Sequence, residues 1–284
     1  MPLVTMTEML QAAKQAKYAV GAFNILDYSS AVAVVRAAEK LSTPVIVQTS
    51  VKTVKFWGAS AIVSWMRHIT ASSALPVALH LDHCKDVEVI KSCIDAGWTS
   101  VMIDASAKPY AENLETTRGV VELAQAASVS VEAEMGRIVG VEDDIFVAQQ
   151  DANLAIPDEA VSFCQGLGLA AFAPAIGTAH GVYKGTPKIA FDRLAEIAQR
   201  TGVPIALHGG TGLSDEVFKK AISLGCAKVN ISTALKYAFI DGFVDYHKAH
   251  QAYEPLKLLA AQSEQIEQVV LNDIRLFGSE GKAN

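Results

Sequence analysis

Residues 77–104, VALHLDHCKDVEVIKSCIDAGWTSVMID, contain the repeating pattern that decides the fold. An apolar run at Val77–Leu81 is followed by a segment with helical periodicity at Val87–Ala96. Gly97 marks the expected helix end, and a second apolar run follows at Ser100–Asp104. Strands that alternate with helices indicate parallel pairing. This stretch therefore predicts one β-α-β unit.

The same pattern recurs on both sides of this unit. Six further strands are expected at Ala19–Phe23, Val45–Thr49, Ser130–Glu134, Ala170–Ala175, Ile205–His208 and Lys228–Ile231. Amphipathic segments lie between them at Ser29–Leu41, Leu114–Ala127, Phe191–Arg200 and Asp215–Leu224. Eight strands predict an α/β fold of the (β/α)8 TIM barrel type. A doubly wound open sheet is the alternative, but no G-x-G-x-x-G motif follows the first strand.

The remaining segments are expected to be additions to one barrel domain that spans residues 1–284. The barrel is predicted to occupy about residues 1–234 and a C-terminal helical extension about residues 235–284, with helices at Leu235–His250 and Ala260–Phe277. The longest stretch without a predicted strand, Gly136–Gln165, is expected to begin as an active-site loop.

The composition is typical of a large globular domain, with 284 residues of which 51% are hydrophobic and 19% charged. A net charge of −6 argues against nucleic acid or an anionic membrane as a partner. The sequence has neither a secretory signal pattern nor a membrane-length apolar run. Its four cysteines lack metal-binding spacing, which predicts reduced thiols and a cytoplasmic protein.

Three histidines fall at the carboxyl ends of different predicted strands: His83, His180 and His208. A single histidine there is more often a hydrogen-bonded structural residue. Three at corresponding ends favour a catalytic zinc site with a vacant fourth position. His80 lies inside a strand and is expected to be structural.

Two glycine- and hydroxyl-rich segments follow the seventh and eighth strands, Gly209–Gly212 and Asn230–Thr233. Barrels commonly hold phosphate at this place, where backbone N–H groups and a helix N-terminus face an anion. Lys184, after His180, would add a full charge.

Four acidic residues are candidates for chemistry near the histidines. Asp82 precedes a candidate ligand and suits a general acid/base or the orientation of a ligand. Asp104 and Glu134 would form an alternate metal site or ordinary salt bridges. Glu142 lies in the acidic loop segment, which would carry a base into the site or remain solvated.

The whole chain resembles the class II fructose-/tagatose-bisphosphate aldolase family. The matching motifs are Tyr18–Asn24, Pro44–Ser50, His80–His83, Ser100–Ser106, Val131–Gly136, Gly140–Asp143, Ala175–Gly181, Leu207–Gly212, Lys228–Thr233 and Phe277–Lys282.

The resemblance implies reversible aldol cleavage of a ketose 1-phosphate or 1,6-bisphosphate to dihydroxyacetone phosphate and an aldehyde. The implied zinc ligands are His83, His180 and His208, with Asp104 and Glu134 at alternate metal positions. Asp82 matches the acid/base at the aldehyde oxygen, and Glu142 matches the carboxylate that takes the α-proton. The expected substrate-binding residues are Asn24, Ser50, Gly181, Lys184, Gly209, Gly210, Thr211, Asn230, Ser232 and Thr233. Family resemblance also implies a homodimer or homotetramer and a response to a monovalent cation, Na⁺ or K⁺.

The chain departs from the family pattern where the aldehyde half of the substrate is bound. Leu256 stands where relatives carry an arginine associated with the distal phosphate, and leucine cannot pair with phosphate. We therefore expect either an aldehyde without that phosphate or its recognition by Lys52, Lys55 or Lys257. Thr211 replaces the usual serine and keeps the hydroxyl.

Two other functions are compatible with parts of the pattern. A metal-dependent barrel hydrolase typically needs a His-x-His pair on the first strand, which Val20–Asn24 lacks. A non-catalytic paralogue that binds sugar phosphate is disfavoured because Asp82, Glu142 and the three histidines are all present.

Overall fold

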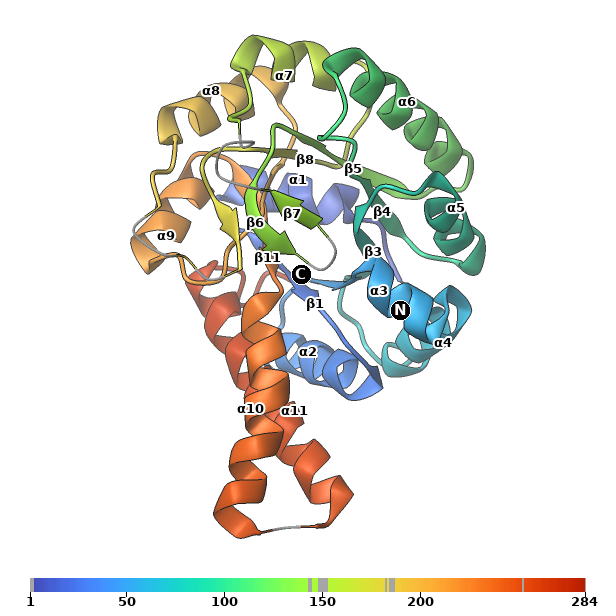
Figure 1. Cartoon of the computed structure of the whole chain (residues 1–284), viewed down its shortest axis with the longest axis vertical. Helices are drawn as coiled ribbons and strands as arrows, with labels where there is room; N and C mark the ends of the chain where they lie inside the picture. The colour runs from blue at the N-terminus through green and yellow to red at the C-terminus, as the bar shows by residue number, and fades with distance from the viewer. Residues whose placement is uncertain are drawn as a thin grey trace.

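The structure, a computed structural model, describes residues 3–142, 145–147, 153–181, 183, 187–251 and 253–283. Eight parallel strands close into a barrel in the order β1-β11-β10-β8-β5-β4-β3-β2, which confirms the predicted fold (Figure 1). The strands are β1 Val20–Asn24, β2 Val45–Thr49, β3 Val77–Cys84, β4 Ser100–Ile103, β5 Ser130–Met135, β8 Ala171–Pro174, β10 Ile205–Leu207 and β11 Cys226–Ile231. They lie at the predicted positions, with ends that differ by a few residues.

Helices surround the barrel and connect its strands. They are α2 Tyr28–Lys40, α3 Val51–Trp57, α4 Ala59–Ile69, α5 Val87–Ala96, α6 Tyr110–Ala126, α7 Pro157–Cys164, α8 Phe191–Thr201 and α9 Asp215–Ser223. Local sequence signals define their ends. Asp27 and Ser30 form a capping box at the start of α2, and α5 ends at Gly97 in the left-handed conformation.

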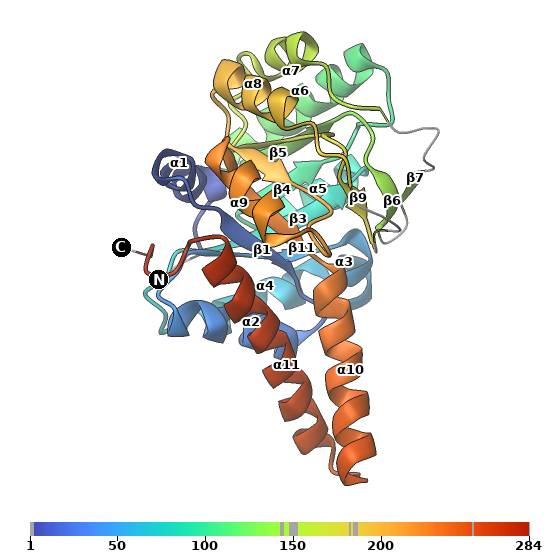
Figure 2. The same cartoon turned by 90° about the vertical axis from the view of Figure 1, so that its left-hand side faces the viewer.

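A helix that the sequence analysis did not identify, α1 Met6–Ala16, covers one end of the barrel. Its buried residues Met6 and Leu10 form a cluster with the strand residues Val20 and Ile46. Figure 2 shows α1 at the end opposite the small β6–β7–β9 sheet. The amino ends of the strands are therefore closed by apolar packing, and the carboxyl ends are left for the functional site.

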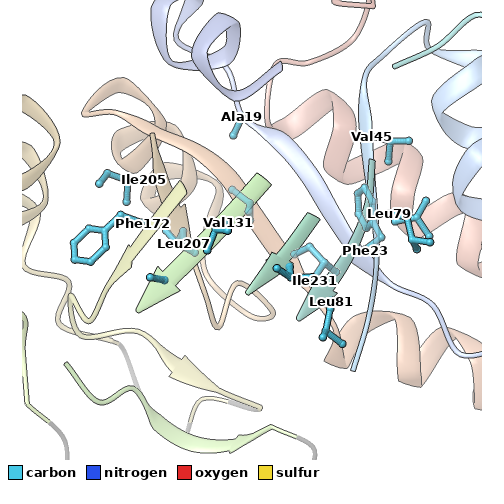
Figure 3. Packing of buried hydrophobic residues seen from close by; sticks show 14 of the residues in the cluster. Ala19, Phe23, Val45, Leu79, Leu81, Val131, Phe172, Ile205, Leu207 and Ile231 are labelled. Atoms are coloured by element: carbon cyan, nitrogen blue, oxygen red, sulfur yellow. The ribbon is translucent and has the colours of Figure 1, made fainter. Parts of the chain in front are cut away.

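Side chains along the strands alternate between an apolar outer layer, which packs against the helices, and the barrel interior, which is apolar where α1 covers it and polar toward the carboxyl ends of the strands. Phe23, Leu79 and Leu81 are fully buried in the core cluster between strands and helices (Figure 3). Each such side chain contributes roughly 1.5–3 kcal/mol by burial. His80 and Lys228 face the interior and are also fully buried. His80 Nδ1 lies 2.8 Å from Ser100 Oγ on the neighbouring strand β4, and Lys228 Nζ lies 2.9 Å from Glu132 Oε2 on β5. This polar interior supports the site.

The segment after β5 corrects one prediction. Gly136–Gln165 was expected to be free of strands, but β6 Val139–Glu142 and β7 Ile145–Val147 form an antiparallel pair there. β6 also pairs in parallel with β9 Ala179–His180. β-Branched and aromatic residues flank the three acidic residues at 142–144, a pattern that favours paired strands over an open loop.

The C-terminal extension is a helical hairpin, α10 Thr233–His250 and α11 Pro255–Leu276, that projects from the barrel (Figure 1). Both helices begin earlier than predicted, α10 at Thr233 and α11 at Pro255. The two helices approach closely because Gly242 has no side chain; a Cβ there would lie 2.9 Å from Gln262 Cα. Among the described helices, none is long and apolar enough to cross a membrane.

Candidate active site

The structure brings the three predicted histidines together at the carboxyl ends of the strands. His83 lies on β3, His180 on β9, and His208 directly follows β10. Their ligand atoms all lie within 4.8 Å of one another, and His208 Nδ1 is 2.8 Å from His83 Nε2. All three residues are at least 91% buried. Three imidazole nitrogens therefore converge from separate elements on a small volume.

A bulge at the end of β3 explains how adjacent residues both reach this site. The pairing of β3 with β4 shifts register between Leu81 and Cys84. His83 within the shift has φ +46°, in the left-handed region that non-glycine residues rarely adopt. Ordinary alternation would send Asp82 and His83 to opposite faces. The bulge instead directs both side chains toward the barrel mouth, and such strain is common at functional sites.

A buried glutamate that the sequence analysis did not single out orients His208. Glu132 Oε1 lies 2.7 Å from His208 Nε2, the ring nitrogen that faces away from the histidine cluster. Burial and the neighbouring His83 lower the pKa of His208, but the contacts with the carboxylates of Glu132 and Glu134 raise it, to about 8. Burial raises the pKa of Glu132, but the charge of Lys228 and the contact with His208 hold it well below its usual range. Glu132 is therefore a carboxylate that fixes the ring of His208.

The two acidic residues predicted at an alternate metal position lie beside the cluster. Asp104 Oδ2 is 3.4 Å from His83 Nδ1, and Glu134 Oε2 is 3.8 Å from the same atom. Glu134 Oε2 is also 3.4 Å from His208 Nδ1, but it has no hydrogen bond within the described part of the chain. Burial raises the pKa of Asp104, while hydrogen bonds from His83 and Ser106 hold it well below its usual range.

Asp82 lies in a pocket of amide donors. Asn24 Nδ2 donates to Asp82 Oδ2 at 3.0 Å, and Gln48 Nε2 donates to the same oxygen at 3.3 Å. Asn230 Nδ2 donates to Asp82 Oδ1 at 3.0 Å. Asp82 is 98% buried. Asn24 and Asn230, predicted to bind substrate, thus hold Asp82 in this structure.

The predicted phosphate-binding segments also lie at the carboxyl ends of the barrel strands. A Cβ at Gly209 would lie 2.3 Å from Ala179 O, so only glycine fits where the two loops cross. Tyr183, which the sequence analysis missed, joins these loops: its hydroxyl donates to Gly209 O at 2.7 Å and accepts from Ala179 N at 3.0 Å. Ser232 Oγ is buried without a hydrogen-bond partner among the described residues.

Other predicted residues have different or undescribed environments. The hydroxyl of Thr211 accepts a hydrogen bond from Ala234 N in the first turn of α10, and the hydroxyl of Ser50 caps α3 by accepting from Thr53 N. The backbone of Glu142 lies on β6, but its side chain is outside the described part of the structure, as is Lys184. Gly181 and Gly210 lie in the loops, and Thr233 begins α10.

The sequence does carry a signal for the missed interior residues. Glu132 and Glu134 are two positions apart on β5, and Lys228 and Asn230 are two apart on β11. Side chains two apart face the same side of a strand. Lys228 could therefore be placed inside the barrel from the sequence, but its ion pair with Glu132, at 2.9 Å, depends on barrel closure.

The donor set fits a divalent metal ion. Three imidazoles leave a coordination position open for a substrate, as in catalytic zinc sites. Glu134 Oε2, a buried carboxylate oxygen without a hydrogen bond in the described region, is the type of group that a cation satisfies. The fold and the site define a class: a (β/α)8 barrel enzyme whose chemistry is at the carboxyl ends of its strands.

Comparisons with known proteins identify the family within this class. The family model for class-II fructose-bisphosphate aldolase matches residues 4–282. A fructose-bisphosphate aldolase of Geobacillus stearothermophilus is 41% identical over all of this chain and 99% of its own length. A probable fructose-bisphosphate aldolase of Bacillus subtilis is 40% identical over the full length of both chains. The crystal structure of the YdjI aldolase from Escherichia coli K12 matches with a TM-score of 0.88 and 31% identity, over 99% of this chain and 100% of that chain.

This chain belongs to the class-II fructose-bisphosphate aldolase family. It is therefore an aldehyde-lyase, and zinc dependence is general in this family.

Proposed function

We propose that this protein cleaves a ketose 1-phosphate or 1,6-bisphosphate reversibly to dihydroxyacetone phosphate and an aldehyde. The observation that carries the proposal is the convergence of His83, His180 and His208 beside the amide-held carboxylate of Asp82. These histidines would hold zinc, and Asp104 and Glu134 would provide the alternate metal position.

A zinc ion at this site would act as a Lewis acid toward the oxygens of the ketose phosphate. Asp82 would take the proton of the substrate hydroxyl during cleavage and return it to the aldehyde oxygen during synthesis. Its position is fixed by the surrounding amides, so little reorganisation accompanies proton transfer. Glu142 would exchange the α-proton of dihydroxyacetone phosphate.

The phosphate of the dihydroxyacetone half would lie where the loops after β9, β10 and β11 meet. The backbone at Gly181, Gly209 and Gly210 allows close approach, and the start of α10 adds positive potential. The buried hydroxyl of Ser232, which has no hydrogen-bond partner in the part of the chain that the structure describes, supports this placement. The remaining residues proposed to contact this phosphate are Thr211, Thr233 and Lys184.

The aldehyde half would be recognised without the family arginine. Leu256 is 74% exposed in the first turn of α11, at the far end of the projecting hairpin, and Lys257 follows it (Figure 1). Lys52 and Lys55 instead lie on α3, which directly follows β2 and Ser50 at the barrel mouth. Within one subunit this favours Lys52 or Lys55 over Lys257 for an anionic aldehyde.

A panel assay tests both parts of the proposal. Cleavage of fructose and tagatose 1-phosphates and 1,6-bisphosphates would be compared, with and without a chelator and with Na⁺ or K⁺ added. We expect chelator-sensitive turnover, with 1-phosphates at least as good as bisphosphates. Efficient bisphosphate cleavage that falls strongly on Lys52→Ala or Lys55→Ala would support lysine recognition instead. An absence of turnover with every ketose phosphate would refute the function.

We also propose that the chain is a single aldolase domain that assembles into a homodimer or homotetramer in the cytoplasm. The projecting hairpin exposes large apolar side chains: Tyr237, Ile240, Phe243, Tyr253, Leu256 and Leu259. Their exposed area is on the order of 700 Å², close to the ~800 Å² that each partner buries in a standard interface. The four cysteines are free thiols, as expected in a reducing compartment.

A further inference from the structure

A series of buried polar side chains crosses the barrel interior and connects His208 with Asp82. Glu132 on β5 and Lys228 on β11 are both fully buried, and Lys228 Nζ lies 2.9 Å from Glu132 Oε2. The same ammonium donates to Asn230 Oδ1 at 2.6 Å, and Asn230 Nδ2 donates to Asp82 Oδ1 at 3.0 Å. The other oxygen of Glu132 contacts His208 Nε2 at 2.7 Å. Lys228 thus contacts both Glu132, which leads to His208, and Asn230, which leads to Asp82.

The ammonium group determines which way the neighbouring amide points. Lysine only donates hydrogen bonds, so the oxygen of the Asn230 amide must face Lys228 and its nitrogen must face Asp82. A second amide pair repeats this arrangement on the other side of the carboxylate. Gln48 Nε2 donates to Asn24 Oδ1 at 2.7 Å, which turns Asn24 Nδ2 toward Asp82. Both carboxylate oxygens therefore face fixed donors.

A lysine at this position is poorly explained by stability alone. Interiors of such barrels are filled mainly by branched apolar side chains, and lysine is almost never fully buried unless it is paired. A buried ion pair often stabilises no better than apolar residues of similar volume. Through Glu132 and Asn230, Lys228 is instead connected to His208 and Asp82, the groups proposed to carry the reaction.

We propose that Lys228 is a positioning residue for the aldol reaction. It holds the Asn230 amide, and through it the Asp82 carboxylate, in the orientation required for proton transfer. It also neutralises Glu132, the carboxylate that orients His208. This inference rests on the proposed roles of Asp82 and His208 and adds the residue that links them.

The test compares Glu132→Gln with the double variant Glu132→Gln/Lys228→Met. Lys228→Met alone would leave Glu132 buried without a counter-charge, so the melting temperature of the metal-free protein should fall. The added Glu132→Gln substitution should restore this temperature. At saturating zinc and substrate, kcat of the double variant should remain on the order of 10- to 100-fold below that of Glu132→Gln, because Asn230 is no longer held. KM should change much less than kcat.

Two further variants separate positioning from general stability. In an Asn230→Ala background with Glu132→Gln, Lys228→Met should cause no further loss of kcat, because the group that it holds is already absent. Lys14→Met is the matched control: Lys14 Nζ donates a hydrogen bond to Gly202 O at the end of α8, so the variant should affect only the melting temperature.

Equal kcat values for Glu132→Gln and the double variant would overturn the inference. It would also be overturned if Lys228→Met lowered kcat in the Asn230→Ala background as much as it does when Asn230 is present. Failure of the unmodified protein to cleave any ketose phosphate would instead refute the proposed function.

Discussion

The bulge at the end of β3 places Asp82, the proposed acid/base, next to His83, a proposed metal ligand. The left-handed φ of His83 turns both side chains toward the mouth, and the surrounding amides fix Asp82. Because the carboxylate is held by hydrogen bonds and not by the metal ligands, its proposed proton-transfer role can be separated from metal binding.

Asp82→Asn should lower kcat by about 10²- to 10⁴-fold, the usual contribution of a general acid/base. Zinc content should stay near that of the unmodified protein, because the three imidazoles are unchanged. Steady-state kinetics and elemental analysis would measure the two effects. Asp95→Asn, on the exposed side of α5, is the matched control and should behave like the unmodified protein. Near-normal turnover of Asp82→Asn would exclude the proposed role.

The histidines could be predicted from the sequence, but much of their surroundings could not. His83 and His208 follow apolar runs of recognisable strands, so their common location follows from parallel strand direction alone. Glu132 and Lys228 lie within such runs, and their partners are about a hundred residues away. Only the closed barrel brings them together. The amide orientations around Asp82 depend on those pairings and are likewise invisible in the sequence.

Among the elements, the β6–β7–β9 sheet supports His180 from outside the barrel. β6 pairs in parallel with β9, and Gly140 is the residue opposite His180. From the sequence this segment is predicted to be a loop, because its acidic residues at 142–144 are more typical of a loop than the flanking β-branched residues are. Its pairing with β9 also requires tertiary contact between segments about forty residues apart.

Gly140→Ala should disturb this support. Gly140 has φ +115°, and a Cβ would lie 2.2 Å from His180 O, so the strand must move. We expect zinc affinity to fall at least tenfold, since shifts around a metal ligand typically cost 10- to 100-fold. Gly166→Ala is the matched control: Gly166 also has a positive φ, +76°, but open space around it. Competition with a chromophoric chelator would measure affinity. Equal affinities for the two variants would contradict this role of β6.

The contact between α9 and α11 should make stability depend on pH. Burial, and to a smaller extent the charge of Asp215, raise the pKa of Asp273 from 3.8 to about 7. The folded state therefore holds this proton more tightly, and its contribution to stability is full below about pH 4 and is lost as pH rises through 7. Asp273→Asn should match the unmodified protein at pH 4 and be more stable at pH 8, by roughly 1–4 kcal/mol.

Melting temperatures of the chelator-treated proteins between pH 4 and 8 would reveal this difference. Asp241→Asn, at an exposed position of α10, provides the control and should show no such trend. A constant difference between Asp273→Asn and the unmodified protein at all pH values would show that the carboxyl group titrates normally.

At the scale of the whole molecule, the projecting hairpin is the feature that a single barrel does not explain. α10 packs one face against α11 through Gly242 and exposes Tyr237, Ile240 and Phe243. A helix with apolar side chains on two faces is normally covered on both. We infer that a second copy of this chain covers the outer face.

Ile240→Glu combined with Phe243→Glu should therefore shift the assembly toward smaller species. Sedimentation velocity would be compared with that of Lys248→Glu, a substitution at an exposed charged position of the same helix. We expect the unmodified protein and the control to sediment as a dimer or tetramer. A double variant that keeps the same sedimentation coefficient would place the interface elsewhere.

The central claim is that His83, His180 and His208 together bind one catalytic zinc ion. Its most direct test is a titration of chelator-stripped protein with Zn²⁺, in which bound metal and ketose-phosphate cleavage are followed in the same samples. The account predicts that activity is absent at the start and rises to a plateau at one equivalent per chain, and that His208→Ala abolishes this tight binding. Full activity of the stripped protein, or unchanged tight binding by His208→Ala, would contradict it.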